Sequence, residues 1–186
     1  MRRIILGLLI FMILFSGCES ENAKPQSDIE LKKEIQEINS FIQKNPIPFV
    51  KEYNNPNLGI RIFWTEISGA GKNPSFGDTL KVDYVARYLR SNWVLDTSIQ
   101  SVAKDYGMSL SERKFVPLEY IFGSSLGKLA TGFEIVFPLM EEGDKVTAFF
   151  PSRYGNQNLT QTRISPNIPL IFELELLEIR AAMHEE

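Results

Sequence analysis

Two patterns of apolar residues divide the chain into a short helical part and a longer strand-rich part. Between residues 28 and 45, apolar residues recur at spacings of four, three and four: Leu31, Ile35, Ile38 and Ile42. This spacing predicts an amphipathic helix that Asp28 is placed to cap and that the sequence NPIP at 45–48 ends. Its apolar stripe has three candidate partners, which are the rest of the domain, another helix and a membrane surface.

Alternation of apolar and polar residues, which is typical of half-buried strands, begins at residue 60. We predict strands over 60–67, 79–89, 92–98, 145–151 and 170–179. One face of the second strand carries Leu80, Val82, Tyr84, Ala86 and Tyr88. One face of the last carries Leu170, Phe172, Leu174 and Leu176. The polar segment 99–114, with weak helical character, is interpreted as an inserted flap.

One short helix is predicted after residue 131. The sequence TGFE at 131–134 matches a capping box, in which Thr131 and Glu134 satisfy the exposed amides of a helix start. Pro138 disfavours helical geometry at Phe137, so this helix can make little more than one turn. An antiparallel sheet with one short helix is an α+β domain.

The N-terminus has the pattern of an export signal. Two arginines precede an apolar run of twelve positions, residues 4–15, which is shorter than the ~20 residues of a membrane-spanning helix. Cys18 is the only cysteine, which excludes an intrachain disulfide, and it follows Ser16 and Gly17 as in the lipobox of bacterial lipoproteins. That resemblance implies lipidation of Cys18, although Phe15 stands where the lipobox usually has leucine. Ordinary secretion with a free thiol and an uncleaved anchor remain as alternatives.

Composition and charge exclude several classes of function. The 186 residues are 44% hydrophobic and 23% charged, as in an ordinary globular protein. Removal of residues 1–17 leaves 18 basic and 23 acidic residues, a net charge of −5, which argues against a nucleic-acid partner. The only histidine, His184, lies in the C-terminal tail, and Cys18 is the expected lipidation site, so we expect no Cys-His or Ser-His nucleophile pair. The chain has no zinc-ligand set and no phosphate-binding loop, so we expect no metal and no cofactor.

Four segments in one order resemble the FKBP-type peptidyl-prolyl cis-trans isomerases. They are GDTLKVDYVARYL at 77–89, LDTS at 95–98, ATGFEIVFPLMEEGDKVTAFFPSRYG at 130–155 and ISPNIPLIFELELLEI at 164–179. The resemblance covers residues 58–180 and implies an FKBP-like fold, a twisted antiparallel β-sheet wrapped around a short α-helix. Lipoprotein members with an N-terminal helix occur in the Bacteroidetes, some linked to gliding motility, and this chain is similar to that group.

The resemblance also implies the residues of the active pocket. It assigns catalytic roles to Tyr84, Asp96, Phe133, Tyr154 and Phe172. It assigns substrate binding to Leu95, Leu118, Leu129, Ala130 and Ile164. The Tyr154 hydroxyl would face the substrate, and Phe133 stands where most members have a tryptophan at the pocket floor. Because two leucines replace phenylalanines and Ala130 is smaller than the usual residue, we expect a wider and less aromatic pocket.

We therefore expect a signal peptide at 1–17, a flexible tether at 18–27, a helical extension at 28–57, an isomerase domain at 58–180 and a tail at 181–186. The expected function is a peptidyl-prolyl isomerase that assists folding of exported proteins, with proline-containing polypeptides as partners. Lipidated Cys18 would hold it in the bacterial cell envelope, and Glu19 favours the outer membrane over the inner. The alternative is a catalytically weak binding module or chaperone lipoprotein of the same fold. No oligomeric state follows from the sequence.

Overall fold

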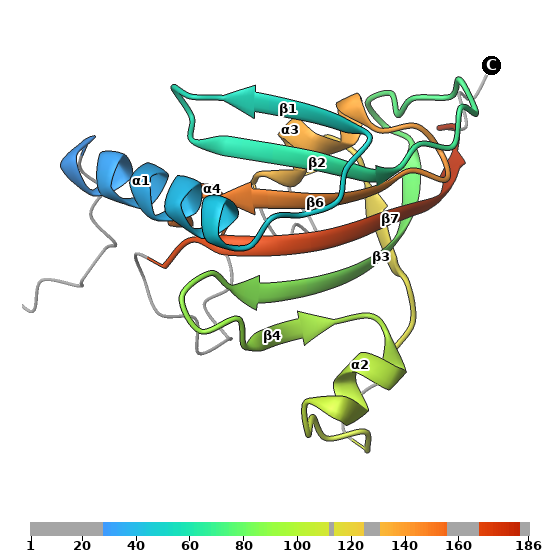
Figure 1. The fold of residues 1–186 in the computed structure, drawn as a ribbon. Coiled ribbons are helices and arrows are strands. Elements are labelled where there is room, and N and C mark those ends of the chain that lie inside the picture. Colours follow the sequence, from blue (N-terminus) through green and yellow to red (C-terminus); the bar gives the residue numbers. More distant parts are fainter. Residues whose placement is uncertain (1–27, 112–113, 125–130, 156–167, 183–186) are drawn as a thin grey trace, which may run out of the picture.

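The fold is a twisted antiparallel sheet with helices on both of its faces (Figure 1). The computed structural model describes residues 28–111, 114–124, 131–155 and 168–182. The strands are β1 (Lys51–Asn55), β2 (Ile60–Glu66), β3 (Thr79–Tyr88), β4 (Val94–Thr97), β5 (Leu118–Ile121), β6 (Lys145–Phe150) and β7 (Leu170–Arg180). The helices are α1 (Asp28–Lys44), α2 (Gln100–Asp105), α3 (Phe133–Val136) and α4 (Ser152–Gly155), with a 3-10 turn at Phe137–Leu139. This architecture confirms the predicted fold class.

The strands lie in the order β1-β2-β6-β7-β3-β4, and β5 pairs with β3 outside this path. The long central strands β3 and β7 pair along their whole length, with Tyr84 opposite Leu174 and Ala86 opposite Phe172. On the other side of β7, Ala148 of β6 also lies opposite Phe172. Phe172 therefore has an alanine on each side in the sheet. These small neighbours leave space on that face for other aromatic rings to pack against Phe172.

Two faces of the sheet carry separate apolar clusters because side chains alternate along each strand. The inner face packs against α3 and forms the main core, which includes Trp64, Val82, Tyr84, Phe133, Phe137, Phe150 and Phe172. The outer face carries a smaller cluster of Ile38, Phe63, Leu89, Phe149 and Ile171. Ile38 belongs to α1, so the amphipathic helix packs on the domain, one of the three arrangements that its stripe allowed. Among the described residues, no helix combines the length and the apolar character that crossing a membrane requires.

The predicted strands are confirmed to within two residues, but β1 and β5 were not predicted. The sequence of β1, KEYNN, has no apolar alternation, and three of its five residues are exposed because it forms the edge of the sheet. Strand β5 has four residues and pairs only with the first part of β3. Both lie where the hydrophobic pattern is weakest.

The start of α3 differs from the predicted capping box. Gly132 is the N-terminal cap residue and no side chain caps the helix, because the Glu134 carboxylate instead accepts a hydrogen bond from the Tyr120 hydroxyl. The helix has the expected length of about one turn. However, Phe137 keeps helical dihedral angles, and a 3-10 turn with Pro138 in its first positions continues the chain. A proline is tolerated there because the first amides of a helical turn have no partner to lose.

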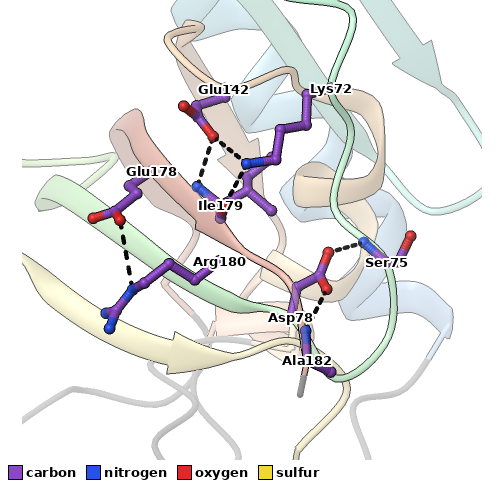
Figure 2. Close-up of polar contacts among 8 residues, drawn as sticks. All are labelled: Lys72, Ser75, Asp78, Glu142, Glu178, Ile179, Arg180 and Ala182. Atoms are coloured by element: carbon purple, nitrogen blue, oxygen red, sulfur yellow. Dashed lines mark hydrogen bonds and ion pairs between the residues drawn. The ribbon is translucent and has the colours of Figure 1, made fainter. Parts of the chain in front are cut away.

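Polar contacts attach the β2–β3 connection to the end of β7 (Figure 2). The Lys72 ammonium lies 2.8 Å from the Glu142 carboxylate and also donates to the Ile179 carbonyl, while the Ile179 amide donates to Glu142 over 2.9 Å. Asp78 accepts hydrogen bonds from the backbone amides of Ser75, at 2.8 Å, and Ala182, at 3.1 Å. Charged and backbone groups therefore hold the β2–β3 connection against this end of the sheet.

Candidate functional site

A buried tyrosine and a half-buried aspartate face each other across strands β3 and β4. Tyr84 is only 6% exposed, and its hydroxyl donates to Asp96 Oδ2 over 2.7 Å. The other carboxylate oxygen of Asp96 accepts from the Thr97 amide at 2.9 Å. The neighbouring Thr97 hydroxyl donates to the Tyr84 carbonyl at 2.8 Å, and the Ser98 hydroxyl accepts from the Tyr84 amide at 2.9 Å. These bonds hold both members of the pair in one geometry.

An aromatic floor forms where α3 crosses the inner face of the sheet. The rings of Phe133 and Phe172 meet edge to face with centroids 5.0 Å apart, and both side chains are almost completely buried. Phe150 lies 5.6 Å from Phe172, and Phe137 lies 5.0 Å from Phe133, between ring centroids. The edge-to-face contact is a favoured arrangement of aromatic pairs, and the two tilted contacts join all four rings into one cluster.

The short helix α4 presents Tyr154 beside the start of α3. The Tyr154 carbonyl accepts a hydrogen bond from the Gly132 amide at 2.8 Å, which joins the two segments directly. Both segments are closely packed, because a Cβ at Gly132 would lie 2.8 Å from the Phe150 ring and one at Gly155 would collide with Leu170. The half-buried Tyr154 side chain packs against the main core. The tyrosine after the AFFP strand therefore lies next to the α3 segment that carries Phe133.

Seven of the ten predicted pocket residues lie in the described part of the chain. Tyr84, Phe133 and Phe172 belong to the main core, and Leu95, Leu118 and Tyr154 are half-buried against it. Asp96 joins them through its bond with Tyr84. Leu129, Ala130 and Ile164 lie outside the described residues, as does the predicted lipidation site Cys18. The catalytic assignments themselves stay predictions.

A second carboxylate, which the sequence pattern predicted only as a helix cap, lies on α3 beside Phe133. Glu134 follows Phe133 and accepts a hydrogen bond from the Tyr120 hydroxyl. Burial raises the pKa of the Glu134 carboxyl, and a hydrogen bond with the Gly123 backbone partly offsets this effect. The sequence pattern assigned Glu134 to a capping box with Thr131, which involves only residues close in sequence, so the contact with Tyr120 was not predicted.

The arrangement suits binding of an apolar ring beside a polar backbone group. Aromatic and aliphatic side chains form most of it, and its polar groups are the Tyr84–Asp96 pair, Tyr154 and nearby backbone amides. Within the ranges that the structure describes, no group of three or more histidine, cysteine or acidic side chains could hold a metal ion. Mostly apolar and aromatic side chains with a few placed polar groups are the usual composition of a small-ligand site.

Comparison with known proteins points to one family. The family model for FKBP-type peptidyl-prolyl cis-trans isomerase matches residues 71–177. A curated relative, the short-type peptidyl-prolyl cis-trans isomerase of Methanocaldococcus jannaschii, is 37% identical over 93 residues, which are 50% of this chain and 56% of the relative. The chain thus spans little more than half the length of that relative.

Two solved structures share the fold. A peptidyl-prolyl cis-trans isomerase from Pseudomonas syringae pv. tomato superposes with a TM-score of 0.55 at 23% identity, covering 84% of this chain and 97% of the other. FkpA from Escherichia coli superposes with a TM-score of 0.56 at 18% identity, covering 83% of this chain and 63% of the other.

Proposed function

Because the chain belongs to the FKBP-type peptidyl-prolyl cis-trans isomerase family, we propose that it accelerates the rotation of peptide bonds before proline in polypeptides. The observation that carries the proposal is the convergence of Tyr84, Asp96, Phe133, Phe172 and Tyr154 from separate elements. These are the residues to which the family resemblance assigns catalysis. The 2.7 Å hydrogen bond joins Tyr84 to Asp96, and the 5.0 Å ring contact joins Phe133 to Phe172. Tyr84, Phe133 and Phe172 belong to one core, and Tyr154 packs against it, although these residues lie between positions 84 and 172 in the sequence.

The reaction needs an apolar pocket more than it needs a reactive group. Rotation about a peptide bond faces a barrier of about 18–20 kcal/mol because the C–N bond is partly double, and X-Pro bonds isomerise in tens to hundreds of seconds unaided. In the twisted transition state the amide loses its resonance, and its carbonyl becomes less polar. An apolar site that holds the proline ring favours this state over the planar amide, which prefers water.

Each of the seven predicted pocket residues within the described part of the chain has a role in this mechanism. The Phe133 and Phe172 rings form the floor beneath the proline ring, and Leu95 and Leu118 line its sides. The Tyr154 hydroxyl donates a hydrogen bond to the substrate carbonyl and so holds that carbonyl in place while the C–N bond rotates. Asp96, held by Tyr84, keeps the polar side of the pocket in one geometry. No proton is transferred and no covalent bond forms in this mechanism.

Exchange between cis and trans proline peptides, measured with and without the purified protein, tests the proposal. We expect a rate far above the uncatalysed one, and a panel of residues before proline will show the preference of the site. An acceleration below about tenfold on every peptide would refute catalysis, because one tenfold step corresponds to only about 1.4 kcal/mol.

A second function, a binding module or chaperone of weak activity, is favoured by one observation. The lining residues Leu95 and Leu118 are half-buried aliphatic side chains, whereas the family resemblance places phenylalanines there. A wider pocket would hold the proline ring less closely and would still bind extended chains. Suppression of aggregation of an unfolded client without acceleration of prolyl exchange would favour this function.

We also propose that the protein acts on exported polypeptides from a lipid anchor at Cys18. The support is the order of basic residues, a twelve-residue apolar run, small residues and a single cysteine at the N-terminus. Two acyl chains suffice for stable anchoring in a membrane. The glutamate at position 19, which in enteric lipoproteins favours the outer membrane over the inner, supports the outer membrane as the location of the anchor.

The substitution Cys18→Ala tests the anchor. We expect the variant to leave the membrane fraction, while its prolyl exchange rate matches that of the wild-type protein. A processed Cys18→Ala protein that still sediments with membranes would show that another feature provides the attachment.

A further inference from the structure

A buried carboxylate lies on the apolar stripe of α1, where packing alone would favour an aliphatic residue. Glu34 is 2% exposed and lies between Leu31 and Ile38, the two other buried residues of this helix. A buried charge is costly unless hydrogen bonds compensate for its lost hydration. The position of Glu34 therefore calls for a partner within the domain.

That partner is the first residue of α4. The Ser152 amide donates to Glu34 Oε2 over 2.6 Å, and the Ser152 hydroxyl donates to Glu34 Oε1 over 2.8 Å. The first amides of a helical turn have no partner inside the turn, and a carboxylate satisfies them with charge-assisted bonds. Glu34, which lies 118 positions before Ser152 in the chain, thus fixes the beginning of α4.

Helix α4 transmits this attachment to the candidate site. Two residues after Ser152, the Tyr154 carbonyl accepts the hydrogen bond from the Gly132 amide, next to Phe133. Gly59 packs closely against both α1 and the residue before α4, because a Cβ at this position would collide with Ile35 and lie 2.9 Å from Pro151. Hydrogen bonds and packing therefore connect α1 to both segments that carry the predicted site residues Tyr154 and Phe133.

We propose that Glu34 is a positioning residue for the isomerase site, a role that rests on the proposed function. It lies outside residues 71–177, the part that the family model matches, so the N-terminal extension supplies a component of the site. By holding Ser152 it fixes α4 and hence the direction of the Tyr154 hydroxyl toward the substrate carbonyl. Without Glu34 the turn shifts, while the main core remains folded.

Three variants of the full chain test this role. Glu34→Ala removes both acceptors, Glu34→Gln retains one oxygen acceptor without the charge, and Glu37→Ala is the control. Glu37 lies on the same helix, but its carboxylate pairs with Arg90 at 3.0 Å on the surface. We measure hydrogen exchange of the Tyr154 and Gly132 amides by NMR, together with kcat and KM for a proline peptide.

In Glu34→Ala we expect exchange at both amides to accelerate at least about tenfold relative to Glu37→Ala, because two hydrogen bonds to a charged group are lost. The central amides of β3 and β7 should keep their protection. We expect kcat/KM to fall by about fivefold or more and Glu34→Gln to recover part of both effects. Equal exchange at Tyr154 and Gly132 in Glu34→Ala and Glu37→Ala would overturn the proposal.

The exchange measurement separates this proposal from the proposed function. If the wild-type chain lacks isomerase activity, the exchange rates still establish or refute the attachment of α4 by Glu34. If Glu34→Ala does not fold, Glu34→Gln and Ser152→Ala, which removes only the hydroxyl donor, replace it against the same control. Unchanged exchange in both of these variants would then refute the attachment.

Discussion

The two faces of the sheet are built from the same strands but are closed in different ways. On the inner face, alternate residues of β2, β3, β6 and β7 form one continuous apolar core with α3. The outer face is divided. One part is an apolar patch under α1, and the other carries ion pairs, such as Arg87–Glu173 at 2.9 Å and Lys145–Glu175 at 3.5 Å.

The two faces therefore contribute to the candidate site in different ways: one sets its shape, and the other attaches helix α1. The continuous inner core sets the shape of the candidate site, because its rings are in direct contact with one another. The apolar patch on the outer face determines where α1 lies (Figure 1). Through Glu34, the helix on the outer face then reaches the turn that carries Tyr154. The outer face therefore affects the site by holding a helix, and the inner face by forming the floor.

The substitution Phe133→Ala, with Phe149→Ala as its counterpart, tests this difference most strongly. Both rings are completely buried, one in the inner core and one beneath α1. Each substitution should lower the free energy of unfolding by ~3–5 kcal/mol, because a large cavity remains. In urea unfolding and prolyl exchange assays, Phe133→Ala should lose far more activity per folded molecule than Phe149→Ala, which reaches the site only indirectly, through the packing of α1. Equal loss of activity in both would mean that Phe133 acts through stability alone.

The inner face was the most predictable part of the fold, because its strands alternate over many residues. The shared faces of 79–89 and 170–179 were predicted from this alternation, and Leu80, Val82, Leu174 and Leu176 are buried as expected. Strand β1 was not predictable in this way. Its sequence KEYNN is polar, and its pairing with β2 depends on backbone bonds that leave no pattern in the side chains.

The site was predictable only where the contacts follow from the family resemblance. Tyr84 and Asp96 were identified together, and the structure joins them by one hydrogen bond. Glu134 was assigned to a cap because its real partner, Tyr120, is 14 residues away in a strand that was not predicted. Glu34 lies beyond the resemblance, and its partner is 118 residues away, so no local pattern identifies it.

The substitution Ile38→Ala tests the packing of α1 on the outer face. Ile38 is 1% exposed within the smaller cluster, so its removal should lower the free energy of unfolding by about 2–3 kcal/mol. The control is Ile29→Ala on the same helix, where the side chain is 80% exposed and the change should stay within about 0.5 kcal/mol. Urea unfolding measures both. Equal stability of the two variants would contradict packing of α1 on the sheet.

The substitution Tyr154→Phe tests the polar contribution to the site. It removes one hydroxyl, so we expect kcat/KM to fall by about two- to tenfold, which corresponds to ~0.5–1.5 kcal/mol of hydrogen bonding. Stability should change little, because the ring remains packed on the main core. Tyr53→Phe, on the edge strand β1, should leave prolyl exchange unchanged. An equal effect of both substitutions would remove the Tyr154 hydroxyl from the mechanism.

The smallest expected effect is on the pH dependence of stability. It compares Glu134, on the inner face, with Glu142, in the polar contacts at the end of the sheet. Burial raises the pKa of Glu134 above its ordinary value of 4.5, so its protonation favours the folded state. Its stabilising contribution is complete below 4.5 and is lost as the pH rises through the folded-state pKa. Hydrogen bonds from Lys72 and the Ile179 amide lower the pKa of Glu142, which reverses the sign. Its contribution is present above 4.5 and is lost as the pH falls through the lowered pKa.

Urea unfolding of Glu134→Gln and Glu142→Gln at a series of pH values measures both contributions. The stability of the wild-type protein relative to Glu134→Gln should decrease as the pH rises above 4.5. Relative to Glu142→Gln, it should decrease as the pH falls below 4.5. The double variant should show the sum of the two differences, because the two carboxylates have separate partners, Tyr120 and Lys72. Slopes of the same sign in both single variants would mean that burial and ion pairing do not distinguish these two regions.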